Sequence, residues 1–103
     1  MVKAGVSAKS VADFHLEKIK EYGYEDYYLY GPFHGNGLME GEAPWVETNS
    51  TYDLEENMTF CSDLFLGNHE KQIGIRIEDV VRITKDGCEN LTAYPLKLFE
   101  IDR

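Results

Sequence analysis

The stretch QIGIRIEDVVRIT, residues 72 to 84, decides the fold. Apolar residues recur at nearly every second position, and successive side chains of a strand point to opposite faces, so this alternation predicts one long strand with an apolar face. The apolar residues of that face are Ile73, Ile75, Ile77, Val81 and Ile83, and the other face carries Glu78 together with Gly74, Arg76 and Arg82. An acid beside two arginines has an ordinary explanation on a strand, a ladder of surface ion pairs.

The segments around this strand predict an α+β fold, a mostly antiparallel sheet with one N-terminal amphipathic helix. Helical spacing of apolar residues from Ser7 to Tyr22 predicts the helix, with Ser7 or Ser10 at its start and Gly23 at its end. Further strands are expected over residues 27 to 31, 58 to 66 and 96 to 101, with a loop at 47 to 57 and a turn at 85 to 87.

Length and charge restrict the classes of function. A chain of 103 residues is expected to form a single domain. Its formal net charge of -9, with ten scattered basic residues, argues against binding to nucleic acid. No apolar run is long enough to span a membrane and the N-terminus lacks the apolar core of a signal peptide, so we expect a cytoplasmic protein. Cys61 and Cys88 are then expected to be buried free thiols.

Three residues carry the chemistry that the sequence suggests. His34 lies among glycines in GPFHGNGLMEGEAPW, residues 31 to 45, and Asp63 interrupts the apolar strand MTFCSDLFL on the same face as Cys61. Glu78 is the acid on the face of the long strand opposite the isoleucines. Each has a structural explanation on its own, but one imidazole and two carboxylates together suit Mn, Fe, Co or Zn.

The order of these motifs resembles the C-terminal half of the pita-bread metallohydrolases, the family of prolidase, aminopeptidase P, methionine aminopeptidase and creatinase. The resemblance is carried by HGNGLMEGEAP, MTFCSDLFLG and GIRIEDVVRITKDGCENLT, and AGVSAKSVADFHLEKIKEYGY resembles the opening of that half. It covers nearly the whole chain. It implies that residues 1 to 103 form half of a pita-bread domain, with a curved sheet.

The resemblance also implies a set of metal ligands. His34 matches the metal-binding histidine of the family, and Glu78 matches the glutamate that bridges two divalent ions, which are Mn, Co, Fe or Zn. Asp63 falls where the family has a glutamate, and the loss of one methylene moves the carboxylate back by about 1.5 Å.

Two departures from the family pattern limit these expectations. The family's proline-specific peptidases carry a second, substrate-facing histidine seven residues after the first, and here that position is Gly41, flanked by Glu40 and Glu42. We expect these two glutamates to bind substrate. The family also takes two aspartate ligands from an upstream hairpin, which is absent here. We therefore expect a truncated chain that is inactive alone and binds at most one ion, weakly.

Three functions stay open at this point. The first is a fragment of a di-metal aminopeptidase or dipeptidase acting on a small peptide or amide. The second is a fragment of a relative with non-peptidase chemistry, creatinase-like or lyase-like. The third is a non-catalytic binding or oligomerisation module. Because half a domain leaves sheet edges and apolar surface uncovered, we also expect a homodimer.

Overall fold

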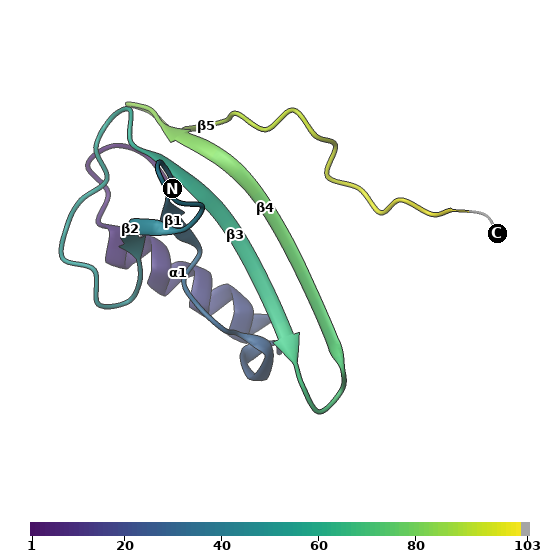
Figure 1. Cartoon of the computed structure of the whole chain (residues 1–103). Helices are drawn as coiled ribbons and strands as arrows, with labels where there is room; N and C mark the ends of the chain where they lie inside the picture. The colour runs from purple at the N-terminus through teal and green to yellow at the C-terminus, as the bar shows by residue number, and fades with distance from the viewer. Residues whose placement is uncertain (102–103) are drawn as a thin grey trace.

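The computed structural model describes residues 1 to 101, and within them the chain forms one α-helix and a five-stranded sheet. The elements are α1 (Ala8–Glu21), the short 3-10 helix η1 (Glu25–Tyr27), β1 (Phe33–Gly35), β2 (Glu42–Val46), β3 (Thr59–Asn68), β4 (Ile73–Ile83) and β5 (Cys88–Asn90). The strand order is β2-β1-β3-β4-β5, and all neighbours are antiparallel. Figure 1 shows β3 and β4 as one long curved hairpin with α1 on one side of the sheet. The predicted α+β fold with a curved antiparallel sheet is confirmed.

The β3–β4 hairpin is the longest paired unit, running from Thr59 opposite Arg82 to Asn68 opposite Ile73. The strict alternation of β4 sends its isoleucines to the face that α1 covers. Glu78 points to the opposite face. This division of the strand into two faces is the one that the sequence predicts.

A single apolar core fills the space between α1 and the sheet. Its buried residues are Ala8, Val11, Ala12, Phe33, Val46, Leu54, Phe60, Val81 and Ile83. The helix begins after Ser7, where the Ser10 hydroxyl donates to the Ser7 carbonyl, and ends before Gly23, whose φ of +75° favours glycine. The predicted helix is thus confirmed within one residue at each end.

Two of the expected strands are wrong. Residues 27 to 31 form no strand: they follow the η1 turn and make one isolated bridge, from Tyr28 to Leu66. The strand starts after Pro32, so that His34 lies within β1 itself. Residues 96 to 101 have no strand partner, and Leu96 and Leu98 are largely exposed. In Figure 1 the segment after β5 runs away from the sheet.

The two outermost strands, β2 and β5, are absent from the sequence-based expectations. Each is short, and β5 has no apolar alternation that would mark it. Because Cys88 begins β5 at the edge of the sheet, its thiol is exposed, whereas Cys61 is buried. The expectation of two buried thiols is therefore wrong for Cys88, although both cysteines are free.

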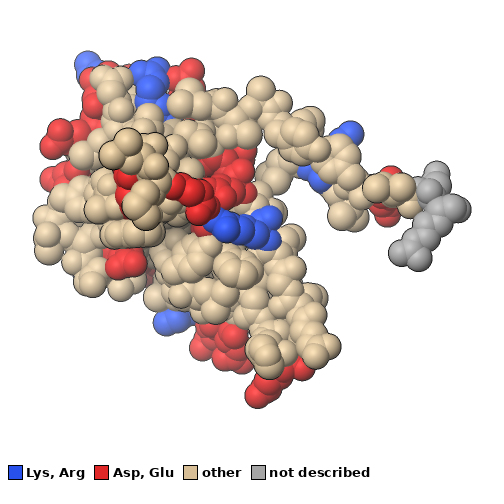
Figure 2. Space-filling model, in the orientation of Figure 1, with Lys and Arg blue, Asp and Glu red and all other residues tan. Residues whose placement is uncertain are grey.

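The far end of the hairpin is only partly covered. Ile73 is 59% exposed and Ile75 53% exposed, because α1 packs against the other half of the isoleucine row. Acidic side chains outnumber basic ones, 19 to 10, and Figure 2 shows several acidic clusters on the displayed face. Within residues 1 to 101, no helix is long and apolar enough to cross a membrane.

The core predicts a large effect of truncating Phe60, which is fully buried and stacks on Phe33. We expect Phe60→Ala to lower the free energy of unfolding by about 3–5 kcal/mol, as is usual for a buried aromatic residue. Urea unfolding followed by circular dichroism measures it. Leu38→Ala is the control, since Leu38 is fully exposed and its loss is expected to change little. A shift of similar size in both variants would contradict this view of the core.

Candidate metal centre

Three neighbouring strands bring potential ligands to the face of the sheet opposite α1. His34 on β1 is paired with Cys61 on β3, so both side chains lie on the same face. Two residues further along β3, Asp63 is paired with Glu78 on β4. The pairing of β1, β3 and β4 therefore assembles residues that are far apart in the sequence.

The three sequence-predicted ligands do lie close together. His34 Nε2 is 3.7 Å from Glu78 Oε1 and 3.8 Å from Asp63 Oδ2. His34 is 6% exposed and Asp63 2% exposed. The Nδ1 atom of His34 is 3.0 Å from the carbonyl of Gly35. If Nδ1 donates there, Nε2 carries the free lone pair and faces the carboxylates.

Arg76 holds the acidic residues of the cluster together. Its Nη2 lies 3.0 Å from Asp63 Oδ2, 3.1 Å from Glu78 Oε2 and 2.9 Å from Glu40 Oε1. Asp63 and Glu78 are directly opposite each other on adjacent strands, where two like charges repel. One guanidinium facing three carboxylates relieves that repulsion but leaves an excess of negative charge.

Asp63 is the most heavily engaged of these acids. Arg76 Nε donates to its Oδ1 at 3.1 Å, Arg76 Nη2 donates to its Oδ2, and the hydroxyl of Tyr30 donates to the same Oδ2. Burial, with the hydrogen bond to Asp63, raises the pKa of Tyr30 to about 12, so the phenol stays a donor. Both oxygens of Asp63 are thus already held by charge-assisted or short hydrogen bonds.

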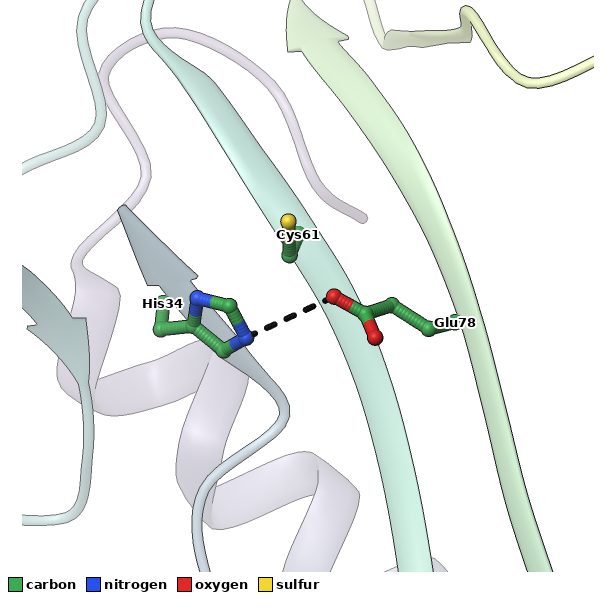
Figure 3. Close-up of side chains that lie close together, drawn as sticks. All are labelled: His34, Cys61 and Glu78. Carbon is green, nitrogen blue, oxygen red and sulfur yellow. Dashed lines mark ion pairs between the residues drawn. The ribbon is translucent and has the colours of Figure 1, made fainter. Parts of the chain in front are cut away.

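Cys61 is the residue of this site that sequence reasoning missed. The side chains of His34, Cys61 and Glu78 each offer a ligand atom, and these three atoms lie within 4.8 Å of one another. Figure 3 shows His34 and Glu78 pointing toward each other from β1 and β4, with Cys61 beside them on β3. Burial, and then the nearby Glu78 carboxylate, raise the pKa of the Cys61 thiol to about 11. The only available signal was its place on the face that also carries Asp63.

A pocket of about 290 Å³ opens beside His34. Its lining includes Tyr30, Glu40, Gly41, Trp45 and Arg76. A Cβ atom at Gly41 would lie 3.5 Å from the Trp45 ring and 3.8 Å from His34 Nδ1, so the absent side chain leaves space next to the imidazole.

The two glutamates expected to bind substrate have different positions. Glu40 lines the pocket and pairs with Arg76. Glu42 instead turns back toward the preceding loop, where its Oε2 accepts a hydrogen bond of 3.1 Å from the backbone of Met39. The structure therefore brings Glu40 to the pocket and leaves Glu42 bracing the turn before β2.

The spacing of the donor atoms suits a single divalent ion. It suits the family's pair of ions less well, because that pair needs more ligands. Ligand bonds of about 2.0–2.3 Å place tetrahedral donor atoms about 3.3–3.8 Å apart. His34, Cys61 and Glu78 meet that spacing after a small contraction from 4.8 Å. Asp63 already accepts three hydrogen bonds from Arg76 and Tyr30, and these compete with a metal for its lone pairs.

Comparison with known proteins gives the same classification as the fold and the donor set. The sequence model of metallopeptidase family M24 matches residues 1 to 85. The class that fold and site define is thus that of the metal-dependent peptidases with a pita-bread fold. This chain belongs to metallopeptidase family M24.

Individual relatives show how much of such a protein the chain represents. The chain is 37% identical over 92 residues to the Xaa-Pro dipeptidase of Pyrococcus furiosus, which covers 87% of this chain and 26% of the relative. An X-Pro aminopeptidase structure from Thermotoga maritima superposes with a TM-score of 0.86 at 35% identity, over 95% of this chain and 28% of that one. The prolidase structure from P. furiosus superposes with a TM-score of 0.82 at 36% identity, over 91% of this chain and 28% of that one. The chain spans about a quarter of the length of these relatives.

The surroundings of the two cysteines predict very different thiol reactivities. Thiolates are the nucleophiles in alkylation, and with a pKa of about 11 only about one Cys61 thiol in a thousand is ionised at pH 8. We expect iodoacetamide at pH 8 to label exposed Cys88 and to spare buried Cys61, with the Cys61 rate rising as the pH approaches 11. Mass spectrometry of the peptides measures both rates.

Two controls accompany this measurement. In urea both cysteines should react, and folded Cys88→Ser should take up almost no label at pH 8. Equal rates for the two thiols in the folded chain would show that Cys61 is not in the environment described.

Proposed function

We propose that this chain is the C-terminal part of a metal-dependent dipeptidase or aminopeptidase that hydrolyses a peptide bond at the N-terminus of a short peptide. The observation that carries this proposal is the convergence of His34 Nε2 and Glu78 Oε1, 3.7 Å apart, at positions where the family motifs have their histidine and bridging glutamate. Family membership supports it, since the proteins named above act on Xaa-Pro substrates.

The residues of the chain take distinct roles in this proposal. His34 and Glu78 hold divalent metal, of which the complete enzyme has two ions, Mn, Co, Fe or Zn. Bound metal polarises the scissile carbonyl and activates water. Arg76 fixes the orientation of Glu78 through its contact with Oε2. The pocket between Trp45 and Glu40 receives the substrate.

The chain alone is proposed to be inactive and to hold at most one ion weakly. Among the residues that the structure describes, the aspartates that precede His34 do not supply the missing ligands. Asp13 lies on α1 in an exposed ion pair with Lys9, and Asp26 lies on η1. A pair of ions needs carboxylates from several directions. Within residues 1 to 101 the candidate carboxylates come only from Asp63 on β3 and Glu78 on β4, and the two upstream aspartates of the family are not supplied.

A chimera tests the proposed activity directly. We expect that replacing the matched 92-residue segment of the P. furiosus Xaa-Pro dipeptidase by this chain gives a protein that hydrolyses dipeptides when Mn or Co is added. The chain alone should give no turnover. Glu78→Gln in the chimera is the control, and it should abolish hydrolysis because a neutral amide lacks the negative charge with which Glu78 would hold divalent metal. Dipeptide hydrolysis is followed by release of the free amino acids.

Non-peptidase chemistry is the second candidate, and Gly41 is the observation that favours it. Where the proline-specific peptidases have a substrate-facing histidine, this chain leaves open space beside His34 and Trp45. Gly41→His in the chimera separates the two candidates, because a Cβ atom at this position would make only ordinary van der Waals contacts. Restoration of Xaa-Pro hydrolysis only by Gly41→His would mean that the natural substrate is another amide. A folded, metal-loaded chimera that is inactive with and without Gly41→His would contradict the peptidase proposal.

We also propose that the chain is a cytoplasmic homodimer that binds neither nucleic acid nor membranes. The partly uncovered isoleucines at the end of β4 and the short outer strands β2 and β5 supply apolar surface and open edges. The third possibility, a module without catalysis, would use the same surface.

Sedimentation equilibrium tests the dimer. At tens of micromolar protein we expect a mass of two chains, with association strengthened by salt because each chain carries a net charge of -9. Ile75→Lys, on the exposed end of the row, should shift the equilibrium toward monomer, whereas Leu38→Lys should not. A monomer at all salt concentrations would contradict the proposal.

A further inference from the structure

The ligand geometry of this chain departs from the imidazole-and-carboxylate set that the family motifs imply. At the position of the family's additional glutamate, Asp63 accepts hydrogen bonds from Arg76 on both oxygens and from Tyr30 on one. A carboxylate that is 2% exposed and accepts three hydrogen bonds has few lone pairs left for a metal, and turning toward one would weaken these charge-assisted bonds. Asp63 is therefore a poor ligand in this chain.

Cys61 offers a third donor atom beside His34 and Glu78. It lies directly across from His34 in the β1–β3 pairing, and its sulfur falls within 4.8 Å of both the imidazole and the Glu78 carboxylate. The thiol is 6% exposed, so few solvent molecules compete for it. Its neighbours in the cluster are the nitrogen donor of His34 on β1 and the oxygen donor of Glu78 on β4.

Glu78 contacts Arg76 with one carboxylate oxygen and faces His34 with the other. Oε2 is 3.1 Å from Arg76 Nη2, which leaves Oε1, 3.7 Å from His34 Nε2, to face the imidazole. The guanidinium of Arg76 therefore does not block the side of Glu78 that a cation would use. Arg76 acts here as a positioning residue.

We propose that His34, Cys61 and Glu78 form a single metal site of mixed nitrogen, sulfur and oxygen ligands that selects Zn²⁺ or Co²⁺ over Mn²⁺, with Asp63 outside it. Thiolate is a soft ligand that favours Zn over the harder Mn ion, and three protein ligands leave a fourth tetrahedral position open. On binding, the Cys61 thiol releases its proton to the solvent and the sulfur bonds to the metal. This inference deepens the proposed function by naming the ligand set of the same site, but it holds for the chain without peptidase activity.

Cobalt provides a direct readout of the sulfur ligand. Adding Co²⁺ to the purified chain should produce a sulfur-to-cobalt charge-transfer band in the near ultraviolet. The band should disappear in Cys61→Ser and His34→Ala and persist in Cys88→Ser, the matched control with the other free cysteine intact. Asp63→Asn should keep the band, because the amide oxygen still accepts the hydrogen bond of Tyr30. Circular dichroism checks that each variant is folded.

Protection of the thiol tests the same site in the unmodified chain. Because the buried thiol reacts slowly at pH 8, its alkylation without metal is first measured in long incubations with excess reagent. At a Zn²⁺ concentration about 100 times the dissociation constant, about 1% of sites are free, so this slow alkylation of Cys61 should fall about 100-fold further. Alkylation of Cys88 should be unchanged, and Mn²⁺ at the same concentration should protect Cys61 far less.

The outcomes separate this inference from the proposed activity. A cobalt band that survives in Cys61→Ser, or Zn²⁺ that fails to protect Cys61, would overturn the mixed ligand set. If Asp63→Asn abolished metal binding while Cys61→Ser kept it, the carboxylate set of the family would be correct and the peptidase proposal would stand. An inactive chimera with an intact cobalt band would overturn only the peptidase proposal.

Discussion

The antiparallel register of β3 and β4 is the constraint on which the rest of the site depends. It sets Asp63 directly opposite Glu78, so two carboxylates meet on one face of the sheet. A slip of one residue would move the whole set to the face that packs on α1, where Phe60 and Val81 are buried. The apolar core therefore fixes the register, and the register brings the two charges together.

Two opposed carboxylates need a cation, and the chain supplies one of its own. Arg76 lies on the same face of β4 as Glu78, within reach of Asp63 and Glu40. Because its fork binds Asp63 through Nε and Nη2 together, this contact is fixed in direction as well as in charge. The guanidinium therefore divides the cluster. Asp63 belongs to the ion-paired part with Tyr30, whereas Glu78 contacts Arg76 through Oε2 and turns Oε1 toward His34.

The parts of the fold that follow from local pattern were predictable from the sequence. The strict alternation of β4 gives the strand, its two faces and the side on which Glu78 lies, and helical spacing with Gly23 gives α1. A strand is expected at residues 27 to 31 because aromatic residues favour strands. This expectation is wrong because pairing with β3 begins only after Pro32. The strand expected at residues 96 to 101 is wrong because, within residues 1 to 101, this segment pairs with none of the strands of the sheet.

The site was predictable only in part for a similar reason. His34, Asp63 and Glu78 are recognisable because their residue types stand out in their segments, and the structure does bring them together. Cys61 does not stand out, since a lone cysteine in an apolar strand is an ordinary buried thiol. Its place in the candidate site comes from its cross-strand partner His34. The pairing of β1 with β3 cannot be predicted from the sequence of either strand alone.

Glu78 is the residue that joins the two parts of the cluster. Its Oε2 belongs to the Arg76 network and its Oε1 faces His34, so a change at Glu78 disturbs the ion pairs and the proposed metal donors at once. Cys61 and Tyr30 each belong to one part only: the thiol lies with His34 and Glu78 Oε1, and the phenol lies with Asp63. Substitutions at these two positions therefore separate electrostatic support of the sheet from the proposed metal binding, which substitution of Glu78 would not do.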